Sequence, residues 1–283
     1  MDDDLLRFEA HGAPELPLAA AQGHVEAAGA KIWYATYGEG APVILLHGGL
    51  GHSGNWGYQV PALLAAGRRV VLIDTRGHGR STRDAGPFTY DLLASDVMAV
   101  MDTLGIEQSA FIGWSDGACT SLVLASKCPG RCAGVLFFAC NMDPSGAKPF
   151  EMTPLVGRCF ARHKKDYLRL SATPDGFTAF VDAVTAMQRA EPNYTARDLA
   201  SIAVPVTVVL GELDEFIRRE HAEYLAQNIA RARFVLLRGV SHFAPLQRPE
   251  AFNELLLMFL QELGDRSADS GHRDRPDRRI VIT

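Results

Sequence analysis

The sequence predicts an α/β protein built on a mostly parallel sheet that helices cover on both faces. Short, continuous apolar runs recur along the chain, and strands that are buried on both faces of a parallel sheet have this pattern. Segments with apolar residues at helical spacing lie between the runs, and this alternation is typical of parallel β-α-β units. The runs are residues 42–46, 70–73, 110–112, 134–138, 206–210 and 234–237.

Composition fits a single large α/β domain or two small ones. The chain has 283 residues, of which 47% are hydrophobic and 22% are charged. This is enough apolar material for a sizeable core. The formal net charge is −5, whereas nucleic-acid-binding proteins usually carry a basic surface, so we expect no nucleic-acid partner. We expect a small-molecule substrate instead, and the sequence leaves the oligomeric state open.

Cysteine usage and the first residues indicate the compartment. The five cysteines include no Cys-x-x-Cys pair and no neighbouring zinc-type ligands, so we expect free thiols, no disulfide framework and no metal site. Met1-Asp2-Asp3-Asp4 is acidic where a signal peptide carries positive charge. The longest apolar stretch, residues 133–140, is far too short to cross a membrane. We therefore expect a soluble, cytoplasmic protein without a membrane partner.

The first half of the chain supplies an arm, a hairpin and helices. Residues 1–22 contain acidic residues and prolines and predict a loose N-terminal arm. Residues 25–37 predict an antiparallel hairpin that turns at Ala28-Gly29 and adds to one edge of the sheet. Residues 91–104 place their apolar side chains on one helical face, and Gly105 follows as a helix stop.

One insertion interrupts the alternation of strands and helices. Residues 141–203 contain no clear buried strand, so we interpret them as a helical cap over a core formed by residues 23–140 and 204–263. Residues 252–263 repeat the helical pattern and predict the last helix of this core. Residues 264–283 mix Arg and Asp with few apolar residues, which predicts a disordered polar tail.

The cap contains one clear amphipathic helix. Its basic residues are interpreted as a solvated face, with attraction of an acidic substrate or partner as the alternative. Other apolar residues of the cap belong either to its core or to the lining of a pocket. The apolar face holds Val156, Phe160, His163, Tyr167 and Leu170; the basic face holds Arg158, Arg162, Lys165 and Arg169; and the ambiguous residues are Phe150, Met152, Phe160 and Met187.

Ser115 is the candidate nucleophile. It lies in Gly113-Trp114-Ser115-Asp116-Gly117, which fits the pattern Gly-x-Ser-x-Gly. An apolar strand runs into this segment and a helix over residues 118–127 runs out of it, and so tight a turn leaves no room for a Cβ two residues on either side of the serine. Ser115 would then stand at the N-terminus of a helix, where backbone amides can stabilise an oxyanion. The alternative is a glycine-rich turn with an idle serine.

A serine hydroxyl needs a base, and the base needs a carboxylate to orient it. His242 follows the last predicted strand and precedes the last helix. Asp214 follows the strand 206–210, and Glu212, Glu215 and Asp143 are alternatives for its role. All of these positions fall in loops at the carboxyl end of the sheet, where parallel sheets place their sites. The chain order Ser, Asp, His also suits a Gly-x-Ser-x-Gly elbow.

The oxyanion hole requires two N–H donors. Asp116, directly after the nucleophile, supplies one, and the loop after the first central strand is expected to supply the other. In that loop we expect the Gly49 N–H, with Leu50 as the second choice, because glycines let a backbone approach the substrate closely. His47 is interpreted as fixing the loop, although it is also a candidate for catalysis.

Over residues 23 to 263 these motifs together resemble those of α/β-hydrolase-fold serine hydrolases. The resemblance implies an eight-stranded, mostly parallel sheet, a helical cap between strands six and seven, and no cofactor. Aspartate stands at the nucleophile position in the haloalkane dehalogenases and epoxide hydrolases of this fold, so Ser115 disfavours those activities. In the family the loop of residues 74–81 is structural, which implies no catalytic role for His78. The matching segments are His47-Gly48-Gly49, residues 74–81, the Ser115 elbow, residues 211–214 and Ser241-His242-Phe243.

The run around Ser115 is also similar to valacyclovir-hydrolase-like α-amino acid ester hydrolases. This similarity implies that the Asp116 carboxylate receives a substrate ammonium, and the alternative is that it bonds backbone of the cap. Leu50, Trp114 and Asp116 are the expected substrate-binding residues. We expect a serine hydrolase that cleaves small carboxylic esters through an acyl-enzyme. An enol-lactone or carbon–carbon bond hydrolase is the alternative enzyme, and a non-catalytic small-molecule receptor is the alternative class.

Overall fold

The computed structural model describes residues 3–268 and 279–282, and it confirms the predicted α/β architecture. The sheet has nine strands in the order β1-β2-β4-β3-β5-β6-β7-β8-β9. β1 and β2 form the expected antiparallel hairpin, and β2 runs antiparallel to β4, while every other pairing is parallel. The strands are β1 Ala21–Ala27, β2 Ala30–Tyr37, β3 Ala41–Leu46, β4 Arg68–Ile73, β5 Ser109–Trp114, β6 Cys132–Phe138, β7 Val206–Gly211, β8 Ala232–Leu237 and β9 Arg279–Ile282.

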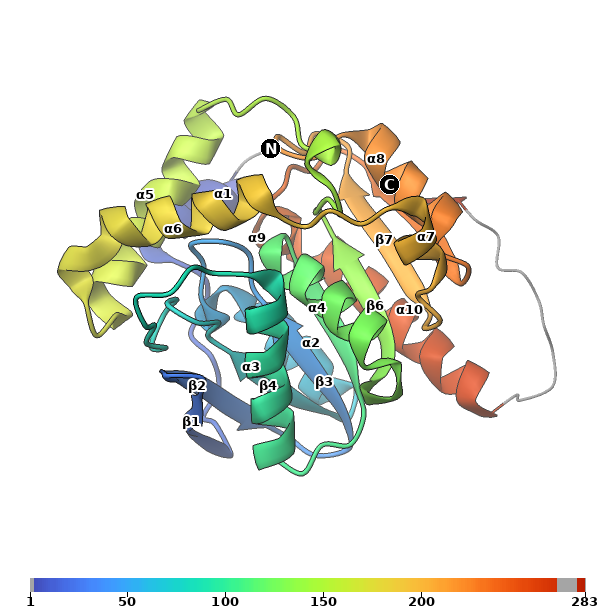
Figure 1. Cartoon of the computed structure of the whole chain (residues 1–283), viewed down its shortest axis with the longest axis horizontal. Helices are drawn as coiled ribbons and strands as arrows, with labels where there is room; N and C mark the ends of the chain where they lie inside the picture. Colours follow the sequence, from blue (N-terminus) through green and yellow to red (C-terminus); the bar gives the residue numbers. More distant parts are fainter. Residues whose placement is uncertain (1–2, 269–278, 283) are drawn as a thin grey trace.

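The six apolar runs of the sequence correspond to β3 to β8, and the central strands are buried along almost their whole length. Helices cover both faces of this sheet: α3 and α4 pack side by side on one face, and α2 and α10 lie on the other (Figure 1). The helices are α1 Asp3–His11, α2 Gln59–Ala65, α3 Tyr90–Thr103, α4 Asp116–Lys127, α5 Pro154–Leu170, α6 Phe177–Ala190, α7 Ala196–Ala200, α8 Arg219–Asn228, α9 Ala244–Gln247 and α10 Pro249–Ala268. In the described residues, no helix combines the length and the apolar character that crossing a bilayer requires.

The two chain ends differ from the expectation. The loose arm is wrong for residues 3–11, which form α1, because Leu5 and Phe8 give this segment an apolar face that packs against α5. The sheet has nine strands rather than eight, because the β-branched residues 280–282 pair in parallel with β8. The disordered tail is therefore wrong for residues 279–282, and α10 also extends beyond residue 263. Residues 269–278 and 283 of the expected tail lie outside the described part of the chain.

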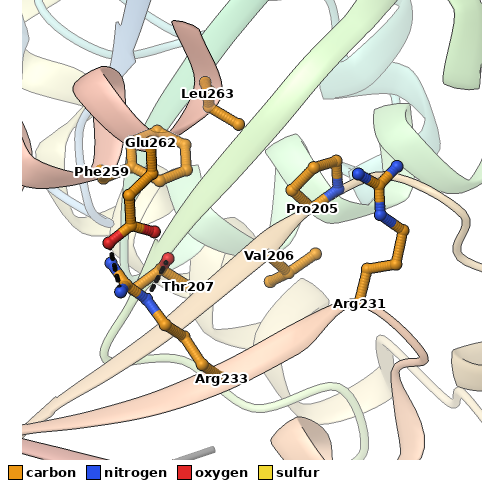
Figure 2. Close-up of a pocket in the computed structure, with 8 residues that line it drawn as sticks. All are labelled: Pro205, Val206, Thr207, Arg231, Arg233, Phe259, Glu262 and Leu263. Atoms are coloured by element: carbon orange, nitrogen blue, oxygen red, sulfur yellow. Dashed lines mark hydrogen bonds and ion pairs between the residues drawn. The ribbon is translucent and has the colours of Figure 1, made fainter. Parts of the chain in front are cut away.

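A buried arginine fixes α10 to the sheet near the amino ends of β7 and β8. Arg233 of β8 donates from Nη1 to the Glu262 carboxylate of α10 at 2.5 Å and from Nε to Thr207 of β7 at 3.2 Å. Figure 2 shows these side chains around a small pocket that Phe259 and Leu263 of α10 also line. The pocket lies at the opposite end of the strands from the predicted catalytic loops, so we assign its residues to the attachment of α10.

Between β6 and β7 the chain forms the helices α5, α6 and α7; α5 and α6 lie across one end of the sheet, and α7 leads into β7 (Figure 1). Sequence reasoning found only α5 here. The interpretation of its basic face as solvated is wrong for Arg162, which is mostly buried and donates from Nε and Nη2 to Asp166 at 2.9 and 2.7 Å. Arg169 reaches the same carboxylate at 3.3 Å, so part of the basic face neutralises one buried acid.

Two buried histidines lie where these helices meet the rest of the molecule. His78, after β4, meets the ring of Phe180 from α6 at 4.7 Å between centroids. His163 of α5 meets the ring of Phe8 from α1 at 5.7 Å. Burial lowers the pKa of each imidazole to about 3, so both are neutral at physiological pH.

A buried ion pair joins three segments of the core. Arg76, in the loop after β4, is fully buried and donates to both oxygens of Asp96 on α3 at 2.7 and 2.8 Å. Its remaining donors reach the backbone oxygens of Ala27 and Ala28 in the hairpin turn. Among the described residues, Asp96 is therefore the one carboxylate that binds the Arg76 guanidinium through both of its oxygens.

We expect Asp96→Ala to lower the free energy of unfolding by about 3 kcal/mol, because the buried Arg76 guanidinium loses its bidentate partner and keeps only Asp84, at 3.6 Å, as an ion-pair partner. Urea unfolding measures this loss. Asp102→Ala is the matched control, since Asp102 lies on the same helix in an exposed pair with Arg131 and should cost under about 1 kcal/mol. Equal losses in the two variants would contradict the role given to the buried pair.

We expect acid to destabilise the fold through His163. Its folded-state pKa of about 3 lies below the ordinary 6.5, so the unfolded chain takes up the proton first and stability falls as the pH drops below about 6.5. Between about pH 8 and about pH 5 this shift removes roughly 2 kcal/mol. His163→Gln should shrink the difference in unfolding free energy between those pH values by that amount. His11→Gln, at an exposed position, should leave the difference unchanged.

Candidate active site

Ser115 occupies a sharp turn from β5 into α4. Its backbone lies at φ 54° and ψ −124°, a left-handed conformation that costs about 1–3 kcal/mol for a residue with a side chain. Any Cβ added at Gly113 would collide with backbone of Ala118, and one added at Gly117 would collide with the Leu46 carbonyl. The flanking glycines are therefore required by packing, and the Ser115 side chain is left partly exposed.

Asp214 and His242 form a buried pair in neighbouring loops. Asp214 lies in the loop after β7 and His242 in the loop between β8 and α9, and His242 Nδ1 lies 2.9 Å from Asp214 Oδ2. The other carboxylate oxygen accepts the backbone N–H groups of Phe216 and Ile217 at 2.9 and 2.8 Å. Because the carboxylate holds the proton on Nδ1, His242 Nε2 is free to accept one.

The other acidic candidates have different partners. Glu215 accepts the backbone N–H of His242 at 3.0 Å, and Glu212 accepts the backbone N–H of Gly239 at 2.9 Å. Asp143 accepts bonds from Ser145 and lies 3.7 Å from the ring of His221. Among these acids, Asp214 is the one whose carboxylate bonds the imidazole of His242.

The elbow that carries Ser115 lies beside this pair, with Trp114 in contact with the His242 ring. In the described chain, the Ser115 hydroxyl makes no hydrogen bond to the His242 ring. Trp114, next to Ser115, lies 6.3 Å from that ring between centroids, so the elbow and the histidine are neighbours. Catalytic hydrogen bonds are often long before substrate binds, so this arrangement is compatible with transfer of a proton between them.

The loop after β3 lies directly against the serine. A Cβ added at Gly48 would stand 3.0 Å from the Ser115 Cβ, and one added at Gly49 would stand 2.6 Å from an Asp116 carboxylate oxygen. His47 holds this loop by bonding the Gly48 carbonyl through Nδ1 at 2.8 Å and accepting the Thr75 N–H at 3.1 Å. Burial lowers the pKa of His47 to about 4, so a neutral, loop-fixing imidazole explains its contacts.

The side chain of Asp116 points away from solvent into a polar network. Tyr90 of α3 donates to its Oδ1 at 2.8 Å, and the Gln188 amide of α6 donates to its Oδ1 and Oδ2 at 3.1 and 2.9 Å. Burial raises the pKa of the Asp116 carboxyl, while these bonds oppose the rise. The cap does bond Asp116, but through a side chain rather than through the expected backbone. The sequence did not predict Tyr90 and Gln188 as partners of Asp116, because they lie 26 and 72 residues from it and no nearby motif identifies them.

Aromatic rings surround the histidine, and sequence reasoning did not find them as a group. Phe216 meets the His242 ring edge-on at 4.6 Å between centroids. Trp114 is buried and packs against Trp56 and Phe243, while Leu50 is partly exposed with φ at 63°. Across the described residues, no cluster of three or more His, Cys, Asp or Glu side chains is arranged to hold a metal ion.

Known proteins resemble this chain in sequence and in fold. The sequence resembles serine hydrolase BPHL of Mus musculus, with 28% identity over 251 residues that cover 82% of this chain and 84% of the relative. It also resembles 3-oxoadipate enol-lactonase 2 of Acinetobacter baylyi, with 26% identity over 245 residues, 78% of this chain and 89% of that one. The solved structure of Est816, described as an N-acyl homoserine lactone degrading enzyme, matches with a TM-score of 0.67 and 30% identity over 84% of this chain and 100% of Est816.

The family model described as "Alpha/beta hydrolase family" matches residues 43–255, which include the Ser115 elbow and both loops of the Asp214–His242 pair. This span covers most of the chain and coincides with the strands β3 to β8 and their covering helices. The chain therefore belongs to the alpha/beta hydrolase family.

Proposed function

We propose that the protein is a serine hydrolase of small carboxylic esters that works through Ser115, His242 and Asp214. The observation that carries the proposal is the buried 2.9 Å contact between His242 Nδ1 and Asp214 Oδ2 beside the strained elbow of Ser115. A histidine held in this tautomer can act as a general base, and a partly exposed serine at such a turn can act as its nucleophile.

The chemistry follows from this arrangement. Ser115 Oγ attacks the ester carbonyl while His242 Nε2 takes its proton, and Asp214 stabilises the resulting imidazolium. The N–H groups of Gly49 and Asp116 bind the oxyanion of the tetrahedral intermediate. The intermediate then collapses to an acyl-enzyme as His242 returns the proton to the leaving alcohol. Water, activated by the same histidine, releases the acid and restores Ser115.

We propose amino-acid-type esters as the finer substrate class. Asp116 follows the nucleophile, and the side chains that bond its carboxylate, Tyr90 and Gln188, are neutral donors that carry no positive charge to balance it. A carboxylate offers about four acceptor positions, of which these donors use three. A substrate ammonium would supply both the missing charge and the fourth bond. The similarity to serine hydrolase BPHL is compatible with this class.

The alternative enzyme keeps the same three residues and changes the bond that is broken. Similarity to an enol-lactonase and to a lactone-degrading structure supports a cyclic ester, and a carbon–carbon bond next to a carbonyl is the third option. Turnover of p-nitrophenyl acetate beside a lactone and a β-diketone separates these reactions. A non-catalytic receptor is the remaining class, and it would turn over none of the three.

We expect Ser115→Ala to lower kcat for p-nitrophenyl acetate by about 10⁴–10⁶-fold, because the nucleophile is lost while the fold remains. A fluorophosphonate probe should label the unaltered protein and leave Ser115→Ala unlabelled. Ser95→Ala, at an exposed serine of α3, is the control and should keep both labelling and turnover. Undiminished turnover by Ser115→Ala would remove the serine from the reaction.

We expect Asp116→Asn to discriminate between substrates by charge. The asparagine keeps the shape of the side chain, so kcat/KM for valine ethyl ester should fall by about 10- to 100-fold more than kcat/KM for ethyl isovalerate, which lacks the ammonium. The ratio of the two constants is the measurement. An unchanged ratio would assign Asp116 to holding Tyr90 and Gln188 and would leave neutral esters as the substrate class.

A further inference from the structure

The position of the leaving group follows from the proposed chemistry. His242 Nε2 must give its proton to the leaving alcohol, so that alcohol lies within hydrogen-bond reach of the imidazole. Four aromatic residues border this ring: Phe216, Phe243, Trp114 and Phe138, with centroids 4.6, 5.6, 6.3 and 6.5 Å away. Trp114, Phe138 and Phe243 are buried, whereas Phe216 is partly exposed. Among these four, Phe216 is therefore the ring that a leaving group can touch from outside.

The aromatic surface continues outward from Phe216. The ring of Phe150 lies 6.3 Å from that of Phe216 at an interplanar angle of 15°, and 6.3 Å from that of Phe160 at 22°. Phe150 remains 62% exposed, and Met152 beside it is 57% exposed. The rings of Phe160, Phe150 and Phe216 form a series of two offset stacks, and Phe216 in turn meets the His242 ring edge-on. Phe150 and Met152 are thus exposed together beside the partly exposed Phe216, and a group of exposed apolar side chains is typical of a surface that contacts a ligand.

Backbone hydrogen bonds fix the segment before Phe150 to the loop that carries Asp214 and Phe216. The Lys148 N–H donates to the Phe216 carbonyl at 2.7 Å, and the Arg218 N–H donates to the Gly146 carbonyl at 2.9 Å. Ala147 and Ile217 form an antiparallel bridge between the same two segments. The segment that leads into Phe150 is thus joined to the loop that carries Asp214, and the two rings are positioned before substrate arrives.

We propose that Phe150 and Phe216 bind the leaving-group alcohol of the substrate and that this alcohol is aromatic. The inference rests on the proposed function, because it takes the direction of proton transfer from His242. A planar ring can extend the series of stacks, whereas a saturated ring of the same size gains the contact area without the stacking. Benzyl-type alcohols have the flat ring and the short reach that this geometry requires.

Binding tests the proposal without turnover. Ser115→Ala protein is titrated with benzyl alcohol and with cyclohexylmethanol, which is of similar size but not planar, and each dissociation constant is measured by ligand-observed NMR. We expect benzyl alcohol to bind about three- to tenfold more tightly. Adding Phe150→Leu, which keeps apolar bulk, should abolish that preference. Adding Leu168→Ala, at an exposed apolar position of α5 outside the stacks, should preserve it. Equal binding of the two alcohols, or a preference that survives Phe150→Leu, would overturn the proposal.

Kinetics on the protein with Ser115 intact separates this inference from the proposed function. The ratio of kcat/KM for benzyl acetate to that for cyclohexylmethyl acetate should exceed one and should fall about three- to tenfold in Phe150→Leu. If both esters turn over and the ratio does not respond to Phe150→Leu, the aromatic leaving-group site is wrong while the hydrolase stands. If neither ester turns over but the preference for benzyl alcohol responds to Phe150→Leu, the site stands and the ester chemistry is wrong.

Discussion

The close approach of α4 to β5 and β3 is the constraint on which the rest of the site depends. Without side chains at Gly113 and Gly117, the chain can turn within one residue, and the strain falls on Ser115. The same turn exposes the serine and sends Asp116 inward, where it meets α3 and the cap. One tight packing contact therefore fixes the candidate nucleophile on one side of the turn and a polar contact to the cap on the other.

The surroundings of that elbow divide between rigid and adaptable parts. In the loops after β3, β7 and β8, the side chains of His47, Asp214 and Glu215 bond backbone atoms. These bonds restrict the movement of the loops that carry the candidate catalytic residues. The cap contributes fewer polar bonds near the serine, among them that of Gln188, together with aromatic contacts that tolerate small shifts. In this arrangement the core holds the candidate catalytic side chains, and the cap covers them with contacts that are more adaptable.

Sequence patterns predicted the parts of this molecule that depend on local chemistry. Continuous apolar runs located β3 to β8, and a Gly-x-Ser-x-Gly segment between a strand and a helix located the elbow. The partners of Asp116 and the stack of Phe150 on Phe216 could not be predicted, because they depend on how the cap folds back over the core. The high Arg and Asp content of residues 264–283 predicted disorder, although residues 280–282 are all β-branched. These residues form a strand because they pair with the edge of β8, a partner distant in the sequence.

That final strand changes what the sheet presents to other molecules. β8 spans six residues and pairs with β7 on one side, so without β9 the N–H and C=O groups on its other side would be unpaired. β9 is shorter, with four residues, and so offers a neighbouring chain a smaller template for intermolecular pairing. Residues 279–282 thereby protect this edge of the sheet against edge-to-edge aggregation.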